Sequence, residues 1–255
     1  MAKSKKKYIV FNWKMNPDTV KEAKELYAKT KRIAGTVRGV TTIVCPPFPY
    51  LGVVSGSYKK SKVFSIGAQN VHEEERGAHT GEVSSRAIKS LGAQYVIVGH
   101  SERRACGETD EAINKKVRAV LEQKMSPIVC IGESERDESA GYLEFLKSQI
   151  ANALRDVTLA DLKNVLIAYE PVWAIGKSED EAMQAHDIHQ IVIFIEKTLR
   201  ELYGTSSGSK VPVLYGGSVG PQNAADLMTH AEVDGLLIGH KSLVIDAVKT
   251  ILKTV

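Results

Sequence analysis

The sequence predicts an α/β fold in which eight parallel strands close into a single (β/α)8 barrel. Three observations support this fold class. Short apolar runs rich in β-branched residues recur along the chain, stretches with helical spacing separate most of them, and polar or Gly-containing segments follow most of the runs. Because the runs mostly lack polar–apolar alternation, we expect strands that are buried on both faces, as in a parallel sheet.

The expected elements alternate evenly from one end of the chain to the other. The expected strands are Tyr8–Trp13, Thr42–Cys45, Val63–Ala68, Tyr95–Val98, Pro127–Ile131, Val165–Tyr169, Val211–Tyr215 and Gly235–Ile238. The expected helices are Pro17–Ile33, Thr109–Gln123, Leu143–Val157, Glu181–Leu202, Pro221–Met228 and Ser242–Leu252. This even repeat favours a closed barrel over a large doubly wound sheet. We interpret the Ser/Gly-rich segment Gly204–Lys210 as a loop, residues 1–7 as a basic, solvated tail, and residues 8–255 as one barrel domain.

Composition limits the class of protein. The chain has 255 residues, a formal net charge of +4 and 43% hydrophobic residues. Basic residues are not interleaved with aromatic ones, and no apolar run is long enough for a signal peptide or a membrane span, so we expect no nucleic-acid or membrane partner. Three widely spaced cysteines without a C-x-x-C motif fit a reducing compartment, so we expect a cytoplasmic protein.

Two polar residues follow expected strands at positions suited to acid–base chemistry. His100 comes shortly after Tyr95–Val98, and Glu170 comes directly after Val165–Tyr169. Because the carboxyl ends of the strands gather on one rim of a barrel, both residues can face one substrate. A carboxylate can take a proton from carbon while a His hydrogen-bonds the oxygen that becomes negative. The alternatives are a structural His and a simple Glu-Pro strand end. The apolar segment 172–176 predicts a loop that closes over a ligand.

Glycine-bearing loops after the seventh and eighth strands predict a phosphate site. The segment 216–218 precedes the expected helix start at Pro221, and Gly239 ends the last strand. Glycines let backbone N–H groups approach an anion, and helix N-termini favour negative charge. Lys14, at the end of the first strand, could neutralise both a phosphate and a developing enediolate. Two ordinary turns and a surface lysine are the alternatives.

Other chemistries lack support in the sequence. His186 and His189 share a helix face but have no apparent third metal ligand, and H-E-x-x-H is absent. The dinucleotide fingerprint G-x-G-x-x-G and the nucleophile motif G-x-S-x-G are also absent. We therefore expect neither a metal nor an organic cofactor.

Motifs along the whole chain resemble those of the triosephosphate isomerases, which are (β/α)8, or TIM, barrels. They are FNWKMN at 11–16, GAQN at 67–70, GE at 81–82, GHSERR at 99–104, EPVWAIG at 170–176 and YGGSV at 215–219. The resemblance implies an aldose–ketose isomerase of glycolysis and gluconeogenesis. It would interconvert dihydroxyacetone phosphate and D-glyceraldehyde 3-phosphate through an enediol(ate) without a cofactor.

The resemblance also implies residue roles. Glu170 would be the base and His100 a neutral electrophile, a pairing for which this family is itself the standard worked example. Lys14 would act electrostatically, and Ser101 and Glu102 would support the catalytic groups. The implied substrate-binding residues are Asn12 and Lys14, with phosphate contacts from the backbone of Gly176, Ser218 and Gly239. We also expect the backbone N–H of His240 to bind the phosphate. Family members are usually homodimers, so the loop around Thr80 is expected to enter a partner subunit.

The chain departs from the family pattern at several positions. Lys177 and Ser178 stand where Thr-Gly is usual, and the segment that follows, up to His189, is about one residue shorter. His240 replaces the second residue of a usual Gly-Gly pair, His79 stands where Phe is common, and Ile193 stands where Arg is usual. The altered lid and His240 leave two alternatives open: an isomerase of a related tetrulose phosphate, or a phosphate-binding barrel without catalysis.

Overall fold

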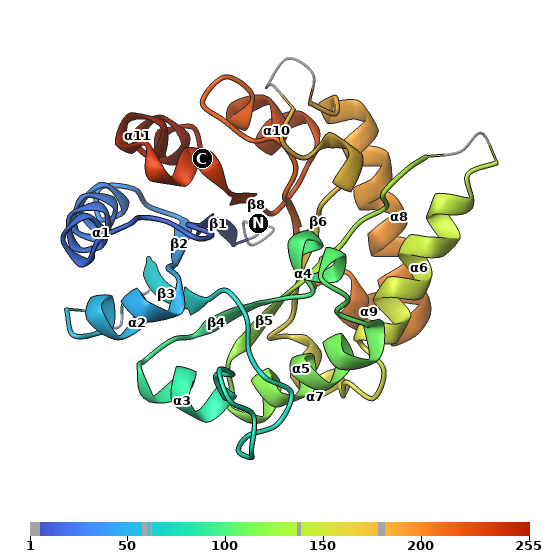
Figure 1. Ribbon diagram of the computed structural model, residues 1–255. Coiled ribbons are helices and arrows are strands. Elements are labelled where there is room, and N and C mark those ends of the chain that lie inside the picture. Colours follow the sequence, from blue (N-terminus) through green and yellow to red (C-terminus); the bar gives the residue numbers. More distant parts are fainter. Residues whose placement is uncertain (1–5, 58–60, 62, 137–138, 178–181) are drawn as a thin grey trace.

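The strands form a closed barrel. The computed structural model describes residues 6–57, 61, 63–136, 139–177 and 182–255. The strands are parallel and pair in sequence order, and β8 closes the barrel against β1 (Figure 1). They are β1 Lys7–Asn12, β2 Val40–Cys45, β3 Phe64–Ala68, β4 Tyr95–Val98, β5 Ser126–Ile131, β6 Leu166–Tyr169, β7 Val213–Tyr215 and β8 Gly235–Ile238. The predicted (β/α)8 fold class is therefore confirmed.

Helices surround the barrel (Figure 1). Thr19 and Thr109 cap α1 and α5 by accepting a backbone N–H of the first turn, which explains why these two helices begin there. The α-helices are α1 Val20–Ala34, α2 Phe48–Ser55, α3 Ser85–Ser90, α4 Ser101–Ala105, α5 Asp110–Glu122, α6 Gly141–Ala153, α7 Leu159–Leu162, α8 Ala185–Tyr203, α9 Thr205–Gly208, α10 Ala224–His230 and α11 Ile245–Lys253. Two 3-10 helices are η1 Val172–Ala174 and η2 His240–Leu243.

Several helix predictions were wrong in detail. Helices α1 and α11 begin three residues later than expected, at Val20 and Ile245, and α6 ends at Ala153 rather than Val157. The segment 204–210, interpreted as a loop, contains the single turn α9, which shows no apolar stripe in the sequence. The helix expected to begin at Pro221 begins at Ala224 instead. The Asn223 side chain accepts the Gly220 N–H and donates to the Ser218 carbonyl, and these bonds hold residues 218–223 in a turn. The glycine loop after β7 therefore does not run directly into a helix.

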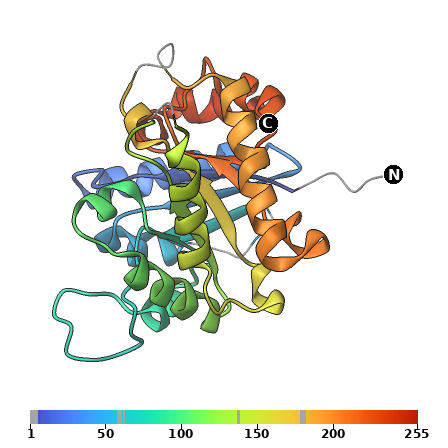
Figure 2. The same cartoon turned by 90° about the vertical axis from the view of Figure 1, so that its right-hand side faces the viewer.

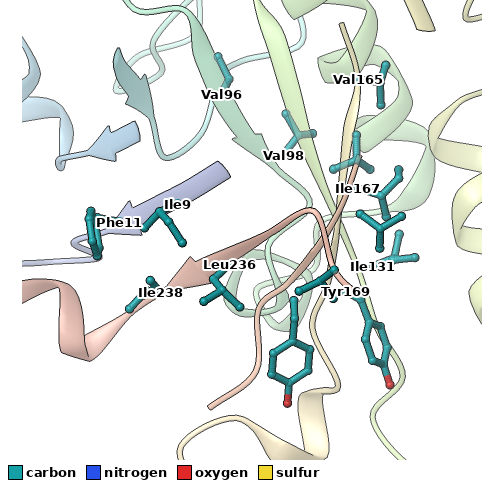
Figure 3. Packing of buried hydrophobic residues seen from close by; sticks show 14 of the residues in the cluster. Ile9, Phe11, Val96, Val98, Ile131, Val165, Ile167, Tyr169, Leu236 and Ile238 are labelled. Atoms are coloured by element: carbon teal, nitrogen blue, oxygen red, sulfur yellow. The ribbon is translucent and has the colours of Figure 1, made fainter. Parts of the chain in front are cut away.

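Side chains of every strand except β3 alternate between two apolar clusters. In β1, Tyr8 and Val10 belong to the inner cluster. Ile9 and Phe11 belong to the outer one, part of which Figure 3 shows. Both faces are apolar, which explains why the sequence shows no polar–apolar alternation. Every second residue of a strand faces the same side, so Asn12 faces inward like Tyr8 and Val10. In β6 the same alternation places Glu170, directly after the strand, on the inward side. The barrel interior thus becomes polar at the carboxyl ends of its strands.

The amino-terminal segment is only partly described. Most of the predicted tail, residues 1–5, lies outside the described residues, and β1 begins at Lys7, which pairs with Val40. Of the helices in the described ranges, none has the length and apolar character needed to cross a membrane.

Candidate active site

A cavity of about 520 Å³ opens at the carboxyl ends of the strands. Its lining contains every residue predicted to be catalytic or substrate-binding: Asn12, Lys14, His100, Glu170, Gly176, Ser218, Gly239 and His240. Glu102 lies beside it in an adjoining hollow of about 400 Å³ that shares Asn12, Lys14 and His100. Residues at or after the ends of five strands, β1, β4, β6, β7 and β8, therefore converge on one space.

Glu170 is fixed by the neighbouring strands. Its N–H donates to the Ile131 carbonyl at 2.7 Å, and the Gly216 N–H donates to the carbonyl of the preceding Tyr169 at 2.8 Å. A Cβ on Gly132 would lie 1.8 Å from the Glu170 carbonyl oxygen, and one on Gly216 would lie 2.8 Å from its Cγ. Glycines on both sides thus make room for the glutamate, whose side chain is only 2% exposed.

The Glu170 carboxylate is held by two donors. Oε1 lies 3.1 Å from Nε2 of His100, and Oε2 accepts the Ser101 N–H at 3.1 Å. Burial raises the pKa of Glu170, but its interaction with His100, with smaller contributions from Ser101 and Cys130, outweighs this effect and lowers the pKa. The buried carboxylate is therefore ionised at neutral pH and can accept a proton.

His100 presents Nε2 to the cavity. It caps α4, and its Nδ1 accepts the Glu102 N–H at 3.2 Å, which places the proton of a neutral ring on Nε2. Burial lowers the pKa of His100, but the Glu170 carboxylate raises it by more. This upward shift favours a charged ring. The Nδ1 contact is the stronger constraint, because a protonated Nδ1 would face another N–H donor. We therefore assign a neutral imidazole that donates through Nε2.

Lys14 adopts an uncommon backbone conformation. Its φ is 54°, which costs energy for a residue with a Cβ. The Asn12 side chain accepts the Lys14 N–H at 3.0 Å, and the Gln69 amide donates to the carbonyl oxygens of Lys14 and Cys45, at 2.9 Å each. The Lys14 ammonium lies 2.5 Å from Glu102. Asn12 and Gln69 thus fix the backbone conformation that orients the Lys14 side chain.

Gln69 is a functional residue that the sequence analysis did not assign. It belongs to the quoted GAQN motif, and its place directly after β3 was the available signal.

The other end of the cavity is formed by the loops after β6, β7 and β8. Gly176 has a φ of +80°, which favours glycine, and a Cβ on Gly239 would lie 3.0 Å from Cε of Lys14. The Ser218 hydroxyl lies 2.9 Å from the carbonyl oxygens of both Ala174 and Lys177, so it holds the lid. His240 is exposed at the start of η2.

The lid, residues 171–177 as described, is anchored by a buried carboxylate that the sequence analysis also missed. Glu133 is 1% exposed, and its Oε1 accepts from Trp173 Nε1 at 2.9 Å, Tyr169 OH at 2.8 Å and Arg136 Nε at 2.9 Å. The Val172 N–H donates to the Glu133 carbonyl at 2.9 Å. The lid's apolar segment is therefore tied to the end of β5. Ser178, the predicted end of the lid, lies outside the described residues.

No metal site accompanies these groups. Throughout the described ranges, no three or more His, Cys, Asp or Glu residues gather in a way that could hold a metal ion. His186 contacts the Gln190 amide, and His189 lies against the Ala231 carbonyl.

The chain is similar to known proteins along almost its whole length. The family model described as triosephosphate isomerase matches residues 7–255. The triosephosphate isomerase of Endomicrobium trichonymphae is 42% identical over 256 residues, 98% of each chain. That of Moorella thermoacetica is 40% identical over 237 residues, 92% of this chain and 93% of the relative. The crystal structure of triosephosphate isomerase from Bartonella henselae covers 98% of each chain at 33% identity, with a TM-score of 0.85. The chain belongs to the triosephosphate isomerase family.

Proposed function

We propose that Glu170, His100 and Lys14 carry out the reaction of this family, the interconversion of dihydroxyacetone phosphate and D-glyceraldehyde 3-phosphate. One observation carries the assignment: a buried, ionised Glu170 lies 3.1 Å from a His100 nitrogen inside a cavity that Lys14 also lines. This arrangement provides a base for a carbon-bound proton and two donors for the oxygen that becomes negative.

The chemistry requires Glu170 to change partners. The neutral ring of His100 has one Nε2 proton, so a substrate oxygen that accepts it displaces Oε1 of Glu170. The freed carboxylate then faces the substrate carbon. Loss of the His100 contact also removes the main cause that lowers the pKa of Glu170, so burial dominates and the base becomes stronger.

Proton transfer then proceeds in two steps. Glu170 takes a proton from one carbon and gives an enediol(ate), which His100 and Lys14 stabilise at its two oxygens. Glu170 returns the proton to the neighbouring carbon. Neither step needs a metal or an organic cofactor.

The phosphate group binds at the other end of the cavity. Backbone N–H groups of Gly176, Ser218, Gly239 and His240 provide donors for the dianion. The lid excludes water and holds the phosphate in the plane of the enediolate, which disfavours its elimination. The relatives reported above give no support to the tetrulose phosphate alternative.

A coupled assay tests this function directly. Triose phosphate should turn over readily and a tetrulose phosphate poorly. Faster turnover of the tetrulose phosphate would overturn the substrate assignment. A protein that binds inorganic phosphate but turns over neither sugar would support the alternative of a barrel without catalysis.

The assembly we propose is a homodimer. Residues 69–84, between β3 and α3, extend away from the barrel (Figure 2). The hollow beside Lys14 is lined in part by Met15, which is 91% exposed, and Phe48. These features support docking of the loop around Thr80 into this hollow of a second copy. Sedimentation should show a dimer at micromolar concentration, and an active monomer would contradict the proposal.

We place the isomerase in the cytoplasm, because the wide spacing of its three cysteines suits a reducing compartment. We propose that residues 8–255 form one domain that can carry the whole reaction, and that residues 1–7 are an extension with no catalytic role. A chain that starts at Tyr8 should keep its turnover.

A further inference from the structure

Lys177 stands between the lid and the phosphate end of the cavity. Its backbone carbonyl lies 2.9 Å from the Ser218 hydroxyl, and it follows Gly176, whose N–H is one of the proposed phosphate donors. Lys177 is one of the residues that line the cavity. The backbone at Lys177 is thus tied to the loop that is expected to bind phosphate.

The ammonium group of Lys177 rests on an aromatic ring. Nζ lies 5.3 Å from the centroid of the Trp173 ring, within cation–π range. Among the residues that the structure describes, no carboxylate pairs with Lys177. Within the described ranges the Trp173 ring is the one partner of this ammonium, so its charge is available for an anion that enters the cavity.

The ring does not depend on Lys177 for its position. Trp173 Nε1 donates to the buried Glu133, and the Arg136 guanidinium lies 5.3 Å from the same ring centroid. If the Lys177 ammonium moves away, Trp173 keeps both of these partners. The side chain of Lys177 can therefore change partners without releasing the start of the lid.

The two possible partners differ in strength. An exposed cation–π contact is among the weaker interactions of a charged group, whereas a hydrogen bond from an ammonium to a phosphate oxygen joins opposite charges. Two other lysines line the cavity, and both are already engaged: Lys14 lies 2.5 Å from Glu102, and Lys241 also has a partner of its own. A phosphate dianion should therefore attract the ammonium of Lys177 away from the ring.

We propose that Lys177 is a further phosphate-binding residue, whose ammonium moves from the Trp173 ring to a phosphate oxygen when the cavity is occupied. This inference rests on the phosphate site of the proposed function. Lys177 supplies positive charge at the phosphate, which leaves Lys14 to act on the enediolate oxygens. The side chain thus adds an ionic contact to a site whose other proposed phosphate donors are backbone N–H groups.

Two substitutions test the charge of Lys177. In K177M, the KM for triose phosphate and the inhibition constant of inorganic phosphate should both rise about tenfold, the factor that corresponds to 1.4 kcal/mol. Because Lys177 does not act on the reacting carbons, kcat should change less than about twofold. K177R keeps the charge and should restore both constants to within about threefold of the parent values. The control K210M removes an exposed lysine that precedes β7 at the opposite rim and should change neither constant.

Binding of inorganic phosphate, measured by calorimetry, gives a readout that does not depend on turnover. The parent should bind phosphate about tenfold more tightly than K177M. Equal affinities, or a K177R variant as weak as K177M, would overturn the role of Lys177. A parent that binds phosphate in this Lys177-dependent way but does not isomerise triose phosphate would overturn the proposed function and keep this inference.

Tryptophan fluorescence reports on the movement itself. The chain has two tryptophans, and Trp13 is 1% exposed in the core, so Trp173 is the one that can respond at the cavity. Saturating inorganic phosphate should change the emission of the parent but not that of K177M. The same phosphate-induced change in both proteins would contradict the movement of Lys177 off the ring.

Discussion

The cavity has one end at which we propose proton transfer, the proton-transfer end, and another at which we propose phosphate binding, the phosphate end, and the two are built from different parts of the chain. At the proton-transfer end the proposed working groups are side chains, and Glu170 and His100 are only 2% and 6% exposed. At the phosphate end the proposed donors are backbone N–H groups on partly exposed loops. Both cavity positions that depart from the family pattern, Lys177 and His240, lie at the phosphate end. A backbone donor survives any substitution except proline, so this end can vary in sequence while the other cannot.

The largest difference between the two ends is expected from a substitution of Glu170, the proposed base. In Glu170→Gln the amide keeps the shape of the side chain but cannot accept a carbon-bound proton. We expect turnover to fall by about 10²–10⁴-fold or more, while inorganic phosphate still binds. A coupled assay and phosphate calorimetry on the same preparation separate the two ends. Near-normal turnover in this variant would show that another group is the base.

Gln69 tests whether the proton-transfer end depends on its supporting contacts. Gln69→Leu leaves the carbonyl oxygens of Lys14 and Cys45 without their donor, at a cost of about 1–3 kcal/mol for each buried acceptor. We expect kcat/KM to fall about 10–100-fold because Lys14 is no longer aimed, with a smaller change in phosphate binding. Gln190→Leu, on the exposed side of α8, is the control. A less stable variant with unchanged kcat/KM would show that Gln69 only stabilises the fold.

The fold and the reacting residues could be predicted because their signals are local in the sequence. Apolar runs mark the strands, and Glu170 and His100 follow directly or after one glycine. The supporting residues could not be found in this way. Gln69 contacts Lys14 across 55 positions, and Glu133 contacts Trp173 across 40. Such contacts exist only once the barrel has closed. The turn α9 was missed because it carries no apolar stripe.

Acidification should remove the stability that the ionised Glu170 carboxylate contributes to the fold. Its pKa is lowered in the folded protein from an ordinary value of 4.5, so the ionised carboxylate stabilises the fold above that value. This stabilisation is lost as the pH falls through the lowered pKa. The difference in unfolding free energy between the parent and Glu170→Gln should therefore shrink from pH 7 to pH 3. Denaturant unfolding at both pH values measures it. A constant difference would show that Glu170 is not held as an anion.

The smallest effect is expected at His240, where the phosphate end relies on its backbone. The N–H that would bind the anion is present in both His and Gly, and the other donors at Gly176 and Ser218 are unchanged. The exposed imidazole can add at most one hydrogen bond, worth about 0.5–1.5 kcal/mol when the ring is neutral. His240→Gly should therefore change the KM for triose phosphate by less than about tenfold, which is 1.4 kcal/mol. A hundredfold gain in triose phosphate efficiency would mean that this position is adapted to another substrate, and the tetrulose phosphate would then become the better assignment.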